Sequence, residues 1–309
     1  MFALVTDSTS PAGIRLEDVP PPSPLPSQVI VDVRAVALNR GEIGMISGIG
    51  KRLGWEFAGV VSAPAEDRSG PRVGERVFGY VSAGVSAAPG TWAQQVAVQT
   101  RHLAPIPNGV SFSAATTLPI AGMTALQVLR LGGSLLGRRV LVGGASGAVG
   151  RFAVALAAKA GAEVTALVRR ANVEGLEKLG AKSVAVGLEQ ADDQYDLILE
   201  STGAAALAHA LEHIAPGGTV VTFGNSSGER TTFDTTKFFL TSGACLRAYV
   251  VFIEAEASAS RDLAYLASLV REGALRPLIS LETSFRDAAA AITAMNRRSV
   301  EGRVVLIVD

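Results

Sequence analysis

The stretch from 143 to 150, GGASGAVG, has residues whose types and spacing could bind a phosphate group. It follows an apolar run, Val140–Val142, that predicts a buried strand, and it leads into an alanine-rich segment that predicts a buried helix. In the fingerprint G-x-G-x-x-G the glycines allow a tight turn, close approach to a pyrophosphate and close helix packing. Ala145, Gly147 and Gly150 take those three places, so alanine replaces the first glycine.

A second β-rich run, Val164–Val168, completes a strand–helix–strand unit around this turn. The free N–H groups and the dipole of the helix N-terminus favour an anion there. We therefore expect Ser146, Ala148 and Val149, together with the fingerprint residues, to surround the pyrophosphate of a dinucleotide. The alternative is an ordinary glycine-rich turn between a strand and a helix.

Two arginines, Arg169 and Arg170, follow the second strand directly. Sites for NAD usually carry Asp or Glu here to hold the ribose 2′-hydroxyl, whereas an arginine accommodates the 2′-phosphate of NADP. A guanidinium pairs with phosphate through two parallel hydrogen bonds and stays charged. The sequence therefore favours NADPH, with solvated surface charges as the alternative reading of this pair.

The composition narrows the class of protein. The chain has 309 residues, enough for two domains, and its 28 basic and 28 acidic residues give a formal net charge of zero. This balance argues against nucleic acid or an anionic membrane as partner. Cys245 is the single cysteine, which excludes an internal disulfide. We find no signal-peptide pattern and no apolar run of membrane-spanning length, and expect a cytoplasmic protein.

The order of expected elements suggests one domain inserted into another. The first third is β-rich, with a strand at 29–37, and a helical stretch at 111–129 follows, capped by Ser113 and broken by Pro119. The central part alternates strands and helices, and the order changes again after Tyr249. We predict an α/β fold in which a Rossmann doubly wound parallel sheet is inserted into a β-rich domain.

Seven segments then give the chain a resemblance to the medium-chain dehydrogenase/reductase superfamily, and within it to the zinc-free quinone oxidoreductase branch. They are LNRGEI (38–43), GWEFAGVV (54–61), VGERVFGY (73–80), LPIAGMTALQVL (118–129), GASGAVG (144–150), PGGTVVTFGNSSG (216–228) and EGRVVLIVD (301–309). The resemblance covers the chain from end to end. It implies a GroES-like catalytic domain made of residues 1–115 and 255–309, and a Rossmann NADP-binding domain of residues 116–254.

The resemblance also implies roles for single residues. Asn39 and Thr124 would lie near the nicotinamide and its phosphate, and Glu42 is a further candidate for orienting substrate or cofactor, with a solvated loop acid as the alternative. No catalytic residue is certain. The other expected cofactor contacts lie at the ends of later strands: Gly203, Gly224, Asn225, Leu246, Arg247 and Ala248. The last three would meet the carboxamide through backbone groups.

The chain also departs from its relatives. Zinc-using alcohol dehydrogenases have G-H-E where this chain has Gly54, Trp55 and Glu56, and Trp55 cannot ligate a metal. The quinone oxidoreductase position often filled by Tyr is Gly44, and the connection from Gly48 to Gly54 is short. We expect no functional metal and an open or reshaped substrate pocket.

Two further motifs could mislead. The segment 224–228, GNSSG, matches the hydrolase pattern G-x-S-x-G, but no histidine follows Ser226, as that family requires. His209 and His213 have a spacing that can bind zinc, but they fall opposite the apolar stripe of a predicted helix and we expect them in solvent.

Two classes of function remain. The first is an NADPH-dependent reductase of quinones or activated C=C bonds (enone, enal or enoyl type) that works without zinc. The second is a non-catalytic NADPH-binding sensor or interaction protein. A homodimer is expected in either case, because the apolar strand predicted at Leu246–Phe252 would lie at a sheet edge. The sequence does not separate the substrate classes.

Overall fold

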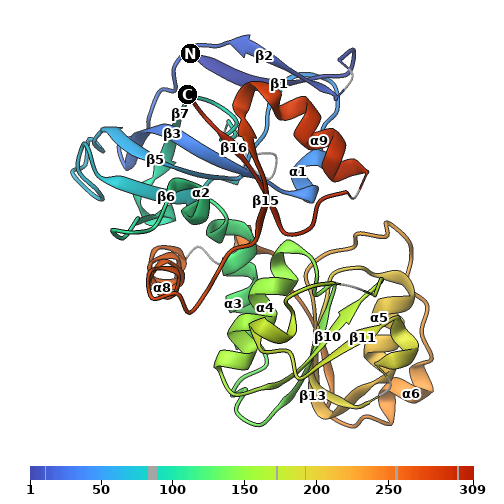
Figure 1. The fold of residues 1–309 in the computed structure, drawn as a ribbon. Helices are drawn as coiled ribbons and strands as arrows, with labels where there is room; N and C mark the ends of the chain where they lie inside the picture. The colour runs from blue at the N-terminus through green and yellow to red at the C-terminus, as the bar shows by residue number, and fades with distance from the viewer. Residues whose placement is uncertain (11, 83–88, 172, 192, 255–256, 298) are drawn as a thin grey trace. The chain divides into compact units, whose positions relative to one another are not determined.

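The structure is a computed structural model that describes all residues except 11, 83–88, 172, 192, 255–256 and 298. The chain divides into two compact units (Figure 1). Unit 1 comprises Met1–Met123 and Ala255–Asp309, and unit 2 comprises Thr124–Glu254. The first boundary between the units thus falls after Met123, inside the helical stretch predicted at 111–129, whereas the expected domain boundary follows residue 115.

Unit 1 is built from two β-sheets. The small sheet has the strand order β2-β1-β4, with β1 Phe2–Asp7, β2 Ile14–Asp18 and β4 Ile49–Arg52. The large sheet has the order β15-β16-β3-β5-β6-β8, and β7 also pairs with β3. Its strands are β3 Gln28–Leu38, β5 Glu56–Ala63, β6 Arg76–Tyr80, β7 Gln95–Gln99, β8 Leu103–Pro105, β15 Ile279–Ser284 and β16 Arg303–Ile307.

Both ends of the chain contribute to this large sheet. The final strand β16 pairs antiparallel with β3, so that Val304 lies opposite Leu38 and Ile307 opposite Ala35. The apolar sequence RVVLI matches its almost complete burial. The helices of unit 1 are α1 Arg40–Gly44, α2 Phe112–Ala115, α8 Ala259–Arg271 and α9 Ala288–Asn296. The β-rich domain made of both chain ends is thus a GroES-like domain in its architecture.

Unit 2 contains one parallel sheet with the strand order β11-β10-β9-β12-β13-β14. Its strands are β9 Arg139–Gly143, β10 Glu163–Val168, β11 Ser183–Val186, β12 Tyr195–Glu200, β13 Ile214–Thr222 and β14 Cys245–Ala248. Its helices are α3 Met123–Arg130, α4 Ala148–Lys159, α5 Ala204–Glu212, α6 Thr235–Phe239 and α7 Val251–Glu254. The predicted Rossmann doubly wound sheet is confirmed.

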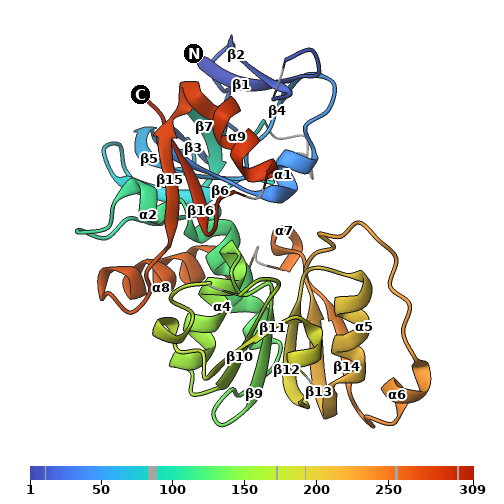
Figure 2. The same ribbon diagram turned by 45° about the vertical axis from the view of Figure 1, so that its right-hand side comes forward.

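The order of strands reverses between β9 and β12. From β9 the chain crosses through α4 to β10 on one side, and from β12 it crosses through α5 to β13 on the other. Because such crossovers are right-handed, opposite directions place α4 and α5 on opposite faces of the sheet, as Figures 1 and 2 show. A reversal of this kind is where open parallel sheets bind ligands.

The helical stretch around Pro119 differs from the prediction in two details. Ser111, not Ser113, caps the first turn, since its side chain accepts a hydrogen bond from the Ala114 N–H. Pro119 lies near the start of a π-helical turn, Leu118–Gly122, so the chain bends through the proline and continues into α3. The missing proline N–H costs least at the start of a helical segment.

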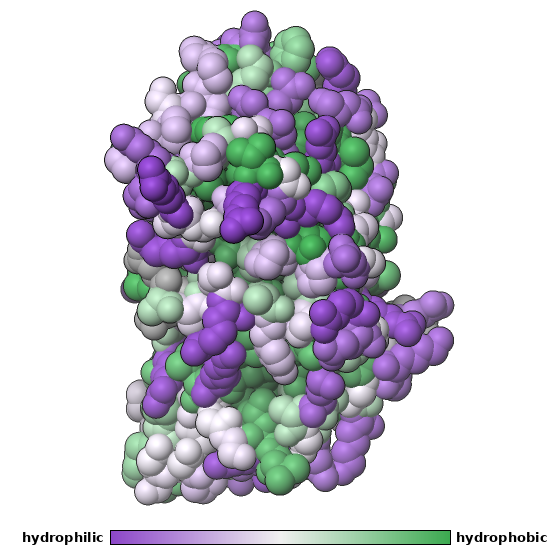
Figure 3. Space-filling view, turned by 90° about the vertical axis from the view of Figure 1, so that its left-hand side faces the viewer, coloured by the Kyte–Doolittle hydropathy of each residue, from purple (hydrophilic) through white to green (hydrophobic). Residues whose placement is uncertain are grey.

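The stretch Phe112–Arg130 corrects the expectation that no apolar run reaches membrane-spanning length, because its length and composition would suffice to cross a membrane. However, 83% of its apolar window is buried inside the fold, as in a core helix. On the molecular face shown in Figure 3, hydrophobic and hydrophilic side chains are interspersed. The apolarity of this stretch is therefore explained by packing.

The turn before β5 generates a test of the fold of unit 1. Gly54 has φ +108°, and a Cβ there would lie 2.5 Å from Cδ1 of buried Trp92. Gly74 has φ +87° but nothing within 4 Å of its added Cβ. We expect Gly54→Ala to lower the free energy of unfolding by about 2–5 kcal/mol, and Gly74→Ala by only about 1–2 kcal/mol. Urea unfolding of both variants checks this, and equal losses would contradict the packing argument.

Candidate active site

The predicted cofactor residues of unit 2 lie at one edge of the parallel sheet. Parallel strands end on the same side, and the turns after β9, β10, β12 and β13 and the end of β14 therefore share this carboxyl edge. All residues predicted to contact the dinucleotide, apart from Asn39 and Thr124, belong to these turns and ends or to the first turn of α4. The structure thus brings together residues spread over a hundred positions.

The turn between β9 and α4 is shaped by small residues. Gly144 has φ +62°, a conformation that favours glycine. A Cβ on Gly150 would lie 2.4 Å from the carbonyl oxygen of Gly144, so glycine is required for α4 to begin this close to the strand. Ala145 is fully buried and its N–H donates to the Leu167 carbonyl, which gives it a structural position.

This turn fits a dinucleotide. Ser146, Ala148 and Val149 are partly exposed and Gly147 is exposed at the start of α4. The first turn of a helix leaves its N–H groups without intrahelical partners, and these groups can bind a phosphate. Arg169 and Arg170 follow β10, the strand that pairs with β9, and both are exposed. The residues present therefore suit a pyrophosphate and a further phosphate nearby.

The neighbouring turns at this edge interlock. Gly203 begins α5 with φ +79°, and a Cβ there would lie 2.2 Å from Oδ1 of Asn225 in the turn after β13. The buried Glu200 carboxylate accepts hydrogen bonds from the backbone N–H groups of Thr202 and Gly203. Gly224 and Asn225 are exposed, as are Leu246, Arg247 and Ala248 on β14. The strand predicted to reach Phe252 ends at Ala248, since Val251 begins α7.

Of the three remaining predicted residues, Thr124 is buried in α3 of unit 2. The other two, Asn39 and Glu42, belong to a buried polar cluster in unit 1 with Glu56 and Arg303. The Asn39 side-chain amide donates to Glu56 over 2.8 Å, and its Oδ1 accepts from Arg303 over 2.9 Å. Arg303 also donates to Glu56 as a buried ion pair. The second oxygen of Glu56 accepts from the Ile120 N–H over 2.8 Å.

Glu42 is buried rather than a solvated loop acid. Its carboxylate accepts from the Asn39 N–H over 2.6 Å and from the Trp55 N–H. Arg303 balances the charge of Glu56, but no second cation belongs to the cluster among the described residues. Burial and the charge of Glu56 therefore raise the pKa of Glu42 to about 8, against the opposing hydrogen bonds from Asn39 and Trp55.

Sequence reasoning missed Glu56 and Arg303 as parts of this arrangement. A signal was available, because each charged residue opens a strand that is otherwise apolar, EFAGVV and RVVLI. Charged residues at such positions are almost never fully buried unless they are paired. Their pairing partner, however, lies about 250 residues away and follows only from the β16–β3–β5 order of the large sheet.

Trp55 lies against α1 beside this cluster. A Cβ on Gly41 would lie 2.4 Å from the indole ring, so glycine at 41 is what makes room for it. Around Gly44 nothing lies within 4 Å of an added Cβ. Among the residues that the structure describes, no group of three His, Cys, Asp or Glu side chains could hold a metal ion. The residues that stand at the zinc position of the relatives do not suit zinc, because indole offers no ligand atom.

The two misleading motifs take other positions. His209 and His213 are half-buried, not solvated, because their rings stack and the ring nitrogens meet the carbonyls of Ala191 and His209. The expectation that they face solvent was wrong. Ser226 lies exposed in the turn after β13, where its N–H donates to the Ser201 carbonyl.

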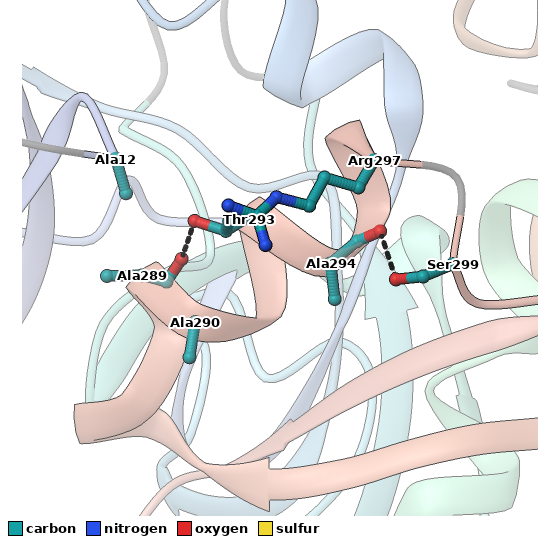
Figure 4. A pocket seen from close by; sticks show the side chains of 7 residues that line it. All are labelled: Ala12, Ala289, Ala290, Thr293, Ala294, Arg297 and Ser299. Atoms are coloured by element: carbon teal, nitrogen blue, oxygen red, sulfur yellow. Dashed lines mark hydrogen bonds between the residues drawn. The ribbon is translucent and has the colours of Figure 1, made fainter.

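An open hollow of about 370 Å³ also lies on unit 1, along α9 (Figure 4). Its lining consists of Ala12, Ala289, Ala290, Thr293, Ala294, Arg297 and Ser299. The hydroxyl groups of Thr293 and Ser299 donate to the carbonyls of Ala289 and Ala294. The polar atoms of this hollow thus largely serve the helix itself, and we do not assign the active site to it.

The buried cluster generates a test of pH dependence. The pKa of Glu42 rises from an unfolded value of 4.5 to about 8, so between these values Glu42 holds a proton in the folded chain that it loses on unfolding. Stability should therefore fall as pH rises through this window, by at most about 1.4 kcal/mol per pH unit. Glu42→Gln should lower stability overall but flatten this slope. Urea unfolding from pH 5 to 8 checks it, and parallel curves for both proteins would refute the assignment.

Comparison with known proteins agrees with this geometry. Residues 25–108 match the family "Alcohol dehydrogenase GroES-like domain", and residues 161–306 match the family "Zinc-binding dehydrogenase". The chain is 29% identical to the spectinabilin polyketide synthase system protein NorB of Streptomyces orinoci over 91% of its own length, but it spans only 13% of that relative.

Two further relatives match over their whole length. The acryloyl-coenzyme A reductase of Sulfurisphaera tokodaii is 24% identical, with 95% of this chain and 96% of that protein covered. The structure of the quinone oxidoreductase from Coxiella burnetii superposes with a TM-score of 0.85 at 24% identity and covers 100% of this chain and 99% of the other. With its GroES-like and Rossmann units matched by these two family models, the chain belongs to the medium-chain dehydrogenase/reductase superfamily.

Proposed function

We propose that this protein is an NADPH-dependent oxidoreductase that reduces quinones or C=C bonds conjugated to a carbonyl group, without zinc. The observation that carries the proposal lies at the carboxyl edge of unit 2. There, glycines allow α4 to begin close to β9, and two exposed arginines follow the neighbouring strand β10. The family supports a nicotinamide cofactor. The names of the relatives, an acryloyl-coenzyme A reductase and a quinone oxidoreductase, support an electron-poor acceptor.

Each part of the carboxyl edge has its own task in this proposal. The backbone N–H groups of the first turn of α4, from Ala148 to Gly150, bind the pyrophosphate, because the Gly147 N–H already donates to the Gly144 carbonyl. Arg169, with Arg170, binds the adenosine 2′-phosphate through charge-assisted hydrogen bonds. The later turns, at Gly203, Gly224 and Asn225, and the backbone of β14 bind the half of the cofactor that reacts.

The chemistry needs little more from the protein than binding and orientation. Bound NADPH supplies a hydride, which adds to the electron-poor carbon of the acceptor. The developing negative charge moves to the carbonyl or quinone oxygen, and that oxygen can take its proton from water. Asn39 is held by Glu56 and Arg303, and Glu42 is enclosed beside it, so both serve to fix one another rather than to transfer a proton.

A second candidate is a non-catalytic NADPH-binding sensor. It is favoured by one observation, the open space around Gly44 where relatives often carry a tyrosine. Turnover separates the two candidates, because a sensor would bind NADPH and reduce no acceptor.

The arginine pair predicts a cofactor preference. A hydrogen bond to a charged group contributes about 1.5–3 kcal/mol, which gives a roughly tenfold to hundredfold preference for NADPH over NADH. Arg169→Glu should abolish or reverse this preference. Lys159→Glu makes the same change of charge at the other end of α4 and should leave the preference intact. Titration with both cofactors checks this, and equal binding by the unmodified protein would refute the assignment.

The reaction type is tested by comparing substrates. Oxidation of an alcohol requires removal of the hydroxyl proton, a step that metal-using relatives assist with a Lewis acid. General-base assistance is worth about 10²- to 10⁴-fold, and quinones and enones do not need it. We expect kcat/KM for NADPH-driven reduction of enones, enoyl thioesters or quinones to exceed that for alcohol oxidation by a similar factor. Comparable rates would mean that a base has been missed, and no turnover would favour the sensor.

We also propose that the protein forms a homodimer through unit 2. Strand β14 ends the sheet and pairs only with β13 in the described sheet. Five of the twelve exposed large hydrophobic side chains in the described part of the chain fall in the segment around it: Phe239, Leu240, Leu246, Val250 and Ile253. An open strand edge flanked by apolar side chains favours pairing with a second copy about a twofold axis.

The dimer is tested by placing a charge beside this edge. Ile253 is 69% exposed, so Ile253→Asp should not disturb the core but should shift the protein towards monomers. Leu136→Asp is the matched control, because Leu136 is 80% exposed in the same unit but precedes β9, which lies three strands away from β14 in the sheet. Light scattering at micromolar concentration gives the masses, and a monomeric unmodified protein would rule the dimer out.

A further inference from the structure

A buried hydrogen bond joins two distant segments of unit 2. The Tyr249 hydroxyl donates to Oε1 of Gln127 over 2.6 Å, and the two side chains are only 5% and 8% exposed. Tyr249 directly follows β14, and its N–H donates to the Thr222 carbonyl at the end of β13. Gln127 lies in α3, one turn after Thr124. The bond therefore connects the carboxyl ends of β13 and β14 to α3.

The Tyr249–Gln127 bond lies at the half of the parallel sheet that contains β13 and β14. A doubly wound sheet binds a dinucleotide across the reversal of strand order, with one nucleotide over each half. The arginines after β10 belong to the half formed by β9, β10 and β11. Strands β13 and β14 belong to the other half, and the nicotinamide half of the cofactor would therefore bind at their carboxyl ends. The Tyr249–Gln127 bond thus lies on the nicotinamide side.

Stability alone is a weak reason for such a pair. A neutral hydrogen bond contributes little net stability, and two apolar side chains of the same shape can replace it at almost no cost. Unlike an apolar contact, however, a hydrogen bond fixes the distance and direction between the groups it joins. This pair therefore sets how far α3, with Thr124, lies from the end of β14.

From this we infer that Tyr249 and Gln127 are positioning residues for the nicotinamide half of the cofactor. The inference rests on the proposed function. The two residues hold α3 and the end of β14 at a fixed spacing, so that groups on both segments meet the nicotinamide and its ribose together. The adenosine half, which is bound by the turn after β9 and the end of β10, does not depend on them.

The experiment compares a whole cofactor with a fragment. Titration calorimetry measures binding of NADP⁺ and of 2′,5′-ADP, which lacks the nicotinamide half, to the full-length protein. We expect Tyr249→Phe to weaken NADP⁺ about tenfold and to leave 2′,5′-ADP unchanged. Gln127→Leu should also weaken NADP⁺ and leave 2′,5′-ADP unchanged, and the double variant should lose less than the sum of the two single variants, because both remove the shared bond. ADP replaces 2′,5′-ADP, and NAD⁺ replaces NADP⁺, if the unmodified protein prefers NADH.

A matched control separates positioning from general destabilisation. Tyr195 is also a buried tyrosine of unit 2, but it is the first residue of β12 and therefore lies at the amino ends of the parallel strands. Tyr195→Phe should leave the ratio of the two affinities unchanged. If Tyr249→Phe weakens both ligands equally, or neither, the inference is wrong. If the unmodified protein binds no nicotinamide cofactor, the proposed function itself fails, which is a separate result.

Discussion

The buried ion pair between Glu56 and Arg303 is the constraint on which unit 1 depends. Charges this deeply buried are tolerated only when paired and hydrogen-bonded, and removing one partner typically costs about 3–5 kcal/mol. The pair joins the start of β5 to the start of the last strand, and Glu56 also holds the Ile120 N–H in the π-helical turn. Both chain ends and the helical stretch towards unit 2 are thereby fixed around Asn39.

In unit 2 the equivalent constraint is steric, because the turns at the carboxyl edge leave no room for side chains at certain glycines. A side chain at Gly203 would overlap Asn225 in the neighbouring turn, and a side chain at Gly150 would overlap Gly144 in its own turn. Small residues leave the backbone N–H groups at the surface of this edge, where an anion can reach them. The same closeness explains why Ala145 serves in place of the first glycine: its N–H and methyl group are directed inward, to the Leu167 carbonyl and the core.

How far the sequence predicted this structure depends on the range of the interactions. The glycine turn, β3 and the strands of the Rossmann sheet follow from local patterns, and so they were predicted. The ends of elements depend on packing: Ser111 rather than Ser113 caps α2, and the strand after β13 stops at Ala248. The cluster around Asn39 could not be derived locally, since its members come together only when β16 pairs with β3. His209 and His213 were misplaced because helical periodicity does not show which backbone carbonyls the rings will meet. The Ala191 carbonyl approaches His209 from another segment, and the His209 carbonyl lies one turn before His213 in α5.

In both units, buried polar groups fix the positions of the segments that they join. In unit 1, Asn39 uses its amide and carbonyl on Glu56 and Arg303, and its backbone N–H on Glu42. In unit 2, Tyr249 and Gln127 satisfy one another. Such groups add little to stability compared with an apolar core, but they exclude alternative packings of the segments they join. Hydride transfer depends steeply on the distance and alignment of the reacting atoms, and a rigid framework supplies these before the substrate binds. The proposed reaction, which would use neither a metal nor a dedicated proton donor, would depend on that framework for the position of the reacting groups.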